Sequence, residues 1–300
     1  MRRALSFSGR LGMKYLSMLL ILMLAVPCLA DDPLFMWTAE KDGNTIHLLG
    51  SIHAGQSSWY PLDERIEQAY TQADTIACEI NIADASMAMK ISLLVMQEGM
   101  YPSGESLRDH IEPATWDTLQ ARVGSSPLAP MLDRMRPGLA AVTVMQGMMA
   151  EVGLDVSQGV DMHILRWAME AERPIVSLET PADQVAILFG PDAVIDAKLL
   201  EEALQDTPAD MKVVLEGLLA AWRAGDPEAM DMVYRADWID DEQMVEFHET
   251  LLVDRNRGMA HELENRHGHW FVVVGALHLC GDEGVPALLD KAGWQVKQVR

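Results

Sequence analysis

The sequence predicts an α/β protein: two βαβ-like units, one near each end of the mature chain, form one sheet, with a large helical region between them. Three observations predict this class. Short apolar runs suited to buried strands occur at 45–49 and 270–274. Each run is followed by the same motif, Gly-x-x-His, at Gly50–His53 and Gly275–His278. From Asp84 onward, most of the intervening chain has helical periodicity.

Residues 1–30 have the pattern of a secretory signal peptide and are excluded from the fold. Four basic residues precede an apolar run at 15–26, and Cys28-Leu29-Ala30 supplies small residues at a cleavage site. The run is too short for a comfortable transmembrane span. We therefore expect export, to the periplasm or beyond, with cleavage after Ala30. The alternative is a membrane anchor formed by the uncleaved segment. Cleavage leaves a single domain, 31–300, with no stable membrane span.

The opening unit begins with two strands, at 35–37 and 45–49, which Asp42-Gly43-Asn44 joins as a turn. A helix follows from about Tyr60 to Ala73, with apolar residues at helical spacing. The short apolar segment 75–80 is the next strand, which completes a strand–helix–strand unit.

The middle and the closing unit follow the same logic. A helical insertion is expected at about 84–153, with breaks at 102–104 and 125–127. A helix from Gly159, a strand within 173–179 and further helices from about 181 to 266 come next. The closing unit comprises strand 270–274, a helix near 286–292 and strand 294–299.

Composition limits the partners. The net charge is −22, and it becomes −26 without the four basic residues of the signal segment. Such an acidic surface argues against nucleic acid and against anionic membranes as partners. Cys78 and Cys280 are the cysteines left after cleavage. Two cysteines do not make a disulfide scaffold, although one bond between them is possible in an oxidising compartment.

The two Gly-x-x-His motifs predict one site assembled from distant parts of the chain. Ligands bind open α/β sheets at the carboxyl ends of the strands, where His53 and His278 are expected. Neutral imidazole is also the commonest metal ligand. A glycine at the end of a strand lets the backbone turn sharply or lets a ligand approach closely, so we expect Gly50 and Gly275, whose backbones shape the turns, to tolerate substitution poorly. The alternative is that these histidines are surface residues or satisfied core residues.

Three carboxylates lie in strands or near strand ends and glycines: Glu79, Asp161 and Glu179. A charge on Glu79, within an apolar strand, is costly unless a metal or an arginine offsets it. The alternative is a glutamate at an exposed strand tip.

Arg255 and Asn256 lie on a long predicted helix before the last unit. There Arg255 could bind an anionic group and Asn256 could orient a carbonyl group, the alternative being an exposed helical arginine. The word that starts at His261 resembles a zincin helix, but Asn265 replaces its second histidine.

As a set, these sequence motifs resemble those of the TraB/GumN (PrgY-like) family. They run in family order over nearly the whole mature chain: Leu48–His53, Tyr60–Leu62, Ala73-Asp74 with Glu79, Gly159–Asp161, Leu178–Thr180, Arg255-Asn256, and Val274–Leu279 with Gly281. That family resembles the Tiki proteins, which are membrane-tethered metalloproteases with paired Gly-x-x-His motifs, and it shares their erythromycin esterase-like α/β architecture.

The resemblance implies that His53, Glu79 and His278 are metal ligands or catalytic groups, and that Arg255 and Asn256 support them. A divalent ion there, zinc, manganese or cobalt, would make the chain a hydrolase of a peptide or small-molecule substrate, with peptidase activity the leading expectation. The alternative is a non-catalytic protein that sequesters a peptide or a metal in the same cleft.

Overall fold

The fold is built around a strand that is buried on both sides, β5 (His269–Gly275). Its side chains divide between two apolar clusters, with Trp270, Val272 and Val274 in one and Phe271 and Val273 in the other. A strand apolar on both faces suits the centre of a parallel sheet that helices cover on each side. β5 pairs in parallel with β2 (Asn44–Ser51) and with β3 (Thr75–Cys78).

Six strands form one sheet in the order β4-β3-β5-β2-β1-β6. The remaining strands are β1 (Met36–Lys41), β4 (Ile175–Ser177) and β6 (Gln295–Gln298). β1 is antiparallel to both of its neighbours, and β4 is parallel to β3. The two predicted units therefore share one sheet and interleave, because β5 lies between β2 and β3. This arrangement confirms the α/β class.

The β1–β2 hairpin explains how the first unit begins. Lys41 pairs with Asn44, so the turn consists of Asp42 and Gly43. These residues have φ angles of 51° and 80°, as a two-residue type I′ turn requires.

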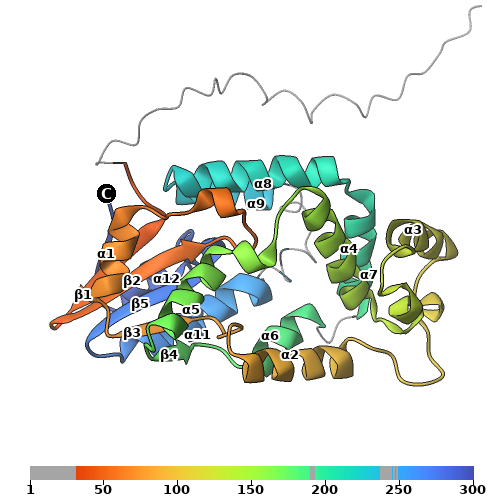
Figure 1. Ribbon diagram of the computed structural model, residues 1–300, viewed down its shortest axis with the longest axis horizontal. Coiled ribbons are helices and arrows are strands. Elements are labelled where there is room, and N and C mark those ends of the chain that lie inside the picture. Colours follow the sequence, from red (N-terminus) through yellow and green to blue (C-terminus); the bar gives the residue numbers. More distant parts are fainter. Residues whose placement is uncertain (1–31, 190–192, 237–244, 246, 248) are drawn as a thin grey trace, which may run out of the picture. The chain divides into compact units, whose positions relative to one another are not determined.

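Helices cover both faces of the sheet (Figure 1). On one face, α1 (Glu64–Gln72) and α5 (Val160–Glu170) pack on Phe271 and Val273. The other face is covered by α9 (Pro227–Arg235), α11 (Arg255–Glu264) and α12 (Val285–Lys291). This layering brings α11, and with it Arg255 and Asn256, against the sheet.

The other helices are α2 (Ala85–Glu98), α3 (Pro113–Val123), α4 (Pro137–Glu151), α6 (Pro181–Leu188), α7 (Ala193–Gln205) and α8 (Pro208–Arg223). Some of them form a second cluster with its own apolar core. Leu200 of α7 packs with Leu119 of α3 and Val144 of α4. The helices expected at 84–153 thus share their apolar core with α7, which comes later in the chain. The sequence did not reveal this, because periodicity shows the apolar side of a helix but not its packing partner.

Short turns connect these elements. They are 3₁₀ turns at Ser57–Trp59, Leu107–Asp109, Ala129–Arg134, Val156–Gln158 and Ala276–Leu279, and a π-helical turn at Glu249–Asp254. The computed structural model describes residues 32–189, 193–236, 245, 247 and 249–300. The predicted signal peptide lies outside this range. Within it, no helix combines the length and the apolar character needed to cross a membrane.

Candidate functional site

The candidate site lies where four parallel strands end together. In the sheet, Ser51 of β2 is level with Gly275 of β5, and Cys78 of β3 is level with Val273. The chain beyond each strand therefore starts from the same edge. His53 follows β2, Glu79 follows β3 and Glu179 follows β4, while His278 lies in the 3₁₀ turn after β5. The local strand-end pattern is thus turned into one site by parallel pairing.

Glu79 is at the centre of this site. Its Oε1 atom lies 3.8 Å from His53 Nε2 and 3.6 Å from His278 Nε2. The same oxygen accepts a hydrogen bond from the Gly275 backbone N–H at 2.7 Å. The other oxygen, Oε2, accepts from Arg255 Nη2 at 2.6 Å. Only 12% of the Glu79 side chain is exposed, so the expectation of a charge that needs a partner holds, and the exposed-tip alternative does not.

Arg255 joins two carboxylates. Its Nε and Nη2 atoms donate to the two oxygens of Glu179 at 2.6 and 2.8 Å, in addition to the bond to Glu79. The amide of Gln184 donates to Glu179 Oε2 at 2.6 Å and to Glu79 Oε2 at 3.3 Å. The anionic groups that Arg255 binds are therefore the protein's own glutamates. Charge-assisted bonds of this kind are short and fix orientation.

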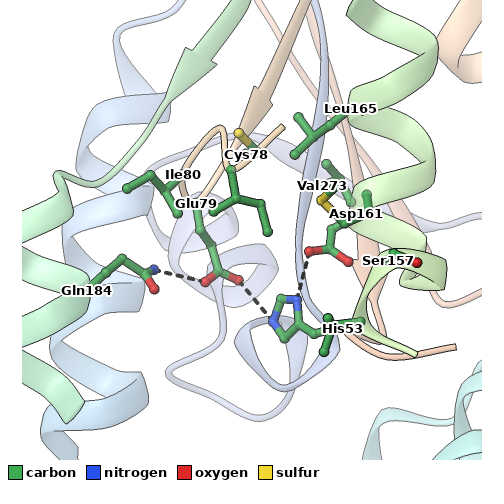
Figure 2. A pocket seen from close by; sticks show the side chains of 12 residues that line it. His53, Cys78, Glu79, Ile80, Ser157, Asp161, Leu165, Gln184 and Val273 are labelled. Atoms are coloured by element: carbon green, nitrogen blue, oxygen red, sulfur yellow. Dashed lines mark hydrogen bonds and ion pairs between the residues drawn. The ribbon is translucent and has the colours of Figure 1, made fainter. Parts of the chain in front are cut away.

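Each histidine is held through its other ring nitrogen. The Asn256 amide donates to the Glu283 backbone carbonyl at 2.8 Å, so its Oδ1 atom accepts from Nδ1 of His278 at 2.6 Å. Nδ1 of His53 donates to Asp161 Oδ2 at 3.1 Å. Asn256 thus orients an imidazole, whereas the sequence suggested a carbonyl group. Both rings are left with Nε2 facing Glu79 (Figure 2 shows His53 with Asp161).

The protonation states of the two histidines differ. Burial lowers the pKa of His278 to about 4, so this ring is neutral near pH 7 and Nε2 has a free lone pair. For His53, desolvation is outweighed by the hydrogen bond to Asp161 and by the charge of Glu79, which raise its pKa to about 9. His53 is 59% exposed, so solvent screens these charges. Desolvation of Glu79 is outweighed by His53 and Arg255, which hold its pKa well below the usual range.

The donor set fits a divalent cation in chemistry but is not closed around one. Within the described part of the chain, no group of three or more His, Cys, Asp and Glu side chains is already arranged to hold a metal ion. Ligand atoms on one tetrahedral zinc ion are about 3.4 Å apart, and the two N···O distances to Glu79 exceed this by a few tenths of an ångström. Carboxylate or carbonyl acceptors on the far ring nitrogens are usual at metal sites.

Gly275 leaves space among the three donors. A side-chain carbon there would lie 2.9 Å from His53 Nε2, 3.3 Å from Glu79 Oε1 and 3.5 Å from His278 Cδ2. The backbone of Gly275 has φ −51° and ψ 138°, which any residue adopts. Gly275 begins the 3₁₀ turn without a positive φ, so of the two expected reasons for a glycine the contacts favour the close approach of the groups around it. We conclude that the residues present fit a divalent cation.

The five predicted site residues, His53, Glu79, Arg255, Asn256 and His278, all lie in this site, and one member was missed. His261 is exposed, in line with the rejection of the zincin-like word. Cys78 and Cys280 are buried free thiols, so the structure contains no bond between them. Burial and the charge of Glu79 raise the pKa of Cys78 to about 12, which leaves it a neutral thiol. Gln184 was not predicted, since a lone glutamine on a helix has no distinguishing pattern.

Comparison with known proteins supports the family resemblance that the ordered motifs indicated. The model of the TraB/PrgY/gumN family matches residues 35–298. The uncharacterized protein YbaP of Escherichia coli is 25% identical over 245 residues, which cover 81% of this chain and 87% of YbaP. An uncharacterized protein of Treponema pallidum is 23% identical over 273 residues, 85% of this chain and 80% of that protein. No solved structure matches.

Proposed function

Because the chain belongs to the TraB/PrgY/gumN family, and because its two Gly-x-x-His words meet at one carboxylate, we propose that it is a metal-dependent hydrolase of amide or ester bonds. Peptides are the expected substrates. One observation carries the proposal: His53 Nε2 and His278 Nε2 both face Glu79 Oε1. Under this proposal these three side chains hold zinc, manganese or cobalt, since imidazole and carboxylate together suit all three.

The chain's own residues prepare the site for this reaction. Asp161 and Asn256 fix the two rings, and Arg255 and the Gly275 N–H fix the carboxylate of Glu79. Three protein ligands leave a position open, as catalytic metal sites do. A divalent cation bound there would acidify water and polarise a carbonyl group.

His53 is the proposed ligand that must release a proton when the cation binds. It is 59% exposed, whereas the His278 side chain is 4% exposed. Its pKa of about 9 means that the metal-free ring carries a proton near neutral pH. Because Nε2 is a proposed ligand atom and Nδ1 is bonded to Asp161, binding of the ion releases that proton to solvent.

The second candidate is a non-catalytic protein that binds a peptide or a metal in the same cleft. The observation in its favour is that Arg255 already neutralises Glu79. A buried carboxylate with such a partner does not depend on a metal for its charge balance.

A calorimetric titration with Zn²⁺, Mn²⁺ and Co²⁺, followed by a peptide-library cleavage assay, tests the proposal. We expect the wild-type protein to bind about one ion and to cleave peptides. His53→Ala and His278→Ala should abolish both properties, because each removes one of three ligands. The exposed histidine His261 provides the matched control, and His261→Ala should behave like the wild type.

The outcomes separate the two candidates. The hydrolase is supported if the wild type binds the metal and cleaves peptides and both site variants lose metal binding and cleavage. Binding without turnover for any of the three metals supports the sequestering protein. Equal binding by the wild type and both site variants would refute the proposed ligand set.

We also propose that the protein is exported and cleaved after Ala30, on the strength of the basic, apolar and small-residue order in residues 1–30. N-terminal sequencing of the protein from a periplasmic fraction tests this. A start at Asp31 is expected, and a retained Met1 in the membrane fraction would show an anchor instead.

A further inference from the structure

A cavity of about 440 Å³ lies directly beside the proposed catalytic groups, with His53, Glu79 and Asp161 in its wall. This volume is within the range of small-ligand pockets. Much of the rest of the wall is apolar and comes from three segments of the chain: Ile80 and Ile82 after β3, Val156, Met162 and Leu165 from the 3₁₀ turn and α5, and Val273 of β5. Figure 2 shows Ile80, Leu165 and Val273 around the same space as His53 and Glu79.

The polar groups of the wall offer little to an acidic substrate group. Among the described residues that line the cavity, His53 is the one basic side chain, and it is bonded to Asp161. Glu79 is paired with Arg255. In the metal-free protein, an acidic group entering the cavity would face two carboxylates and would lose its water without gaining a new cationic partner.

The depth of the cavity favours an apolar group. Leu165 and Val273, each 1% exposed, belong to the core of the sheet. Ile82 and Val156 also line the cavity, yet they are 39% and 57% exposed. Single exposed apolar side chains are ordinary on a protein surface. Two on one cavity, beside a buried apolar wall, present a continuous surface that an apolar ligand group would remove from water.

We propose that this cavity is the specificity pocket of the site and that it takes the apolar side chain next to the scissile bond. This inference rests on the proposed hydrolase function. The substrate class is then peptides or N-acyl amides with a leucine-, methionine- or phenylalanine-like group at that position. Aspartate- or glutamate-like groups are disfavoured. Val156 is the specificity-determining residue that can be changed most safely, because its side chain is largely exposed.

Binding is tested without metal or turnover. N-acetyl-leucinamide and the α-amide of N-acetyl-aspartic acid, which keeps its side-chain carboxylate, are titrated into protein with labelled isoleucine and methionine methyl groups, and NMR shifts are followed. We expect the signals of Ile80, Ile82 and Met162 to move with the leucine compound. The affinity for the aspartate compound should be lower by at least roughly tenfold. Signals that stay unmoved by the leucine compound, or equal binding of both compounds, would overturn the proposal.

Cleavage provides the second test, with a peptide library and metal-loaded protein. Apolar residues next to the cut should be preferred over acidic ones by roughly 10- to 100-fold in kcat/KM. Val156→Lys should shift this ratio toward acidic residues by roughly tenfold, since it places a cation at the cavity. The matched control is Val213→Lys, because Val213 is 62% exposed on α8 and does not line the cavity.

The two tests fail in different ways. Apolar-selective binding without cleavage would support the pocket and refute the hydrolase. Cleavage without apolar preference, or an equal shift in both lysine variants, would refute the pocket and leave the hydrolase intact.

Discussion

Replacing Gly275 with alanine would test the proposed cation site separately from the fold that carries it. The new methyl carbon would lie 2.9 Å from His53 Nε2, closer than side-chain carbons approach other atoms in proteins. His53 must therefore move outward by roughly half an ångström or more to reach van der Waals contact. Because φ at Gly275 is −51°, alanine itself introduces no backbone strain.

The expected result follows from which group gives way. The His53 side chain is 59% exposed, so its movement should cost little folding free energy, on the order of 1 kcal/mol or less. Cation affinity should fall much more, by at least roughly 10- to 100-fold, the range seen when even an outer-shell partner of a metal ligand is lost. Calorimetric titration measures the affinity, and denaturant unfolding measures the stability.

Gly147→Ala is the matched control, because nothing lies within 4 Å of the added carbon on α4. It should leave affinity unchanged and raise stability by about 0.5–1 kcal/mol. Wild-type affinity in Gly275→Ala would refute the idea that the three donors share one ion. A stability loss of several kcal/mol would instead show that Gly275 is needed by the fold.

Three more predictions follow from the contacts of the site. Asn256→Ala should weaken cation binding roughly 10- to 100-fold, because His278 loses the acceptor that fixes its tautomer; unchanged affinity by calorimetry would contradict a positioning role. Glu179→Ala breaks a buried ion pair and should cost about 3 kcal/mol in denaturant unfolding, whereas Glu262→Ala, in an exposed pair, should cost less than about 1 kcal/mol. Cation affinity should fall about tenfold per pH unit below about 9, since the ion displaces the proton of His53; a flat affinity between pH 7 and 9 would show that no proton is released.

The convergence of the histidines could be anticipated because its cause is local. A strand that ends in Gly-x-x-His delivers its histidine to the carboxyl edge, and parallel strands in register bring their edges together. Glu79 was identified by a cost: a carboxylate in an apolar segment needs a partner. The sequence left two partners open, a metal or an arginine, and the structure shows the arginine.

The partners themselves could not be read from the sequence. Arg255 contacts Glu79 across 176 residues and Glu179 across 76, and no periodicity or spacing encodes such a contact. Neither Gly50 nor Gly275 has a positive φ, so close contacts, and not a left-handed backbone, disfavour a side chain at these positions. A side chain at Gly50 would come within 2.6 Å of the ring of Phe35, the residue before β1, so crowding by that ring sets the position. Crowding depends on tertiary packing, which a single sequence does not display.

The charges of the site explain why an arginine does not exclude a cation. Glu79, Glu179 and Asp161 carry three formal negative charges, and Arg255 supplies one positive charge. The proton on His53 reduces the remainder to −1. A divalent cation that displaced this proton would bring the sum to zero. Such neutralisation is favourable in a partly buried site, where charges are poorly screened. The arginine thus holds the carboxylates in place but leaves two negative charges uncompensated, the number that one divalent ion satisfies.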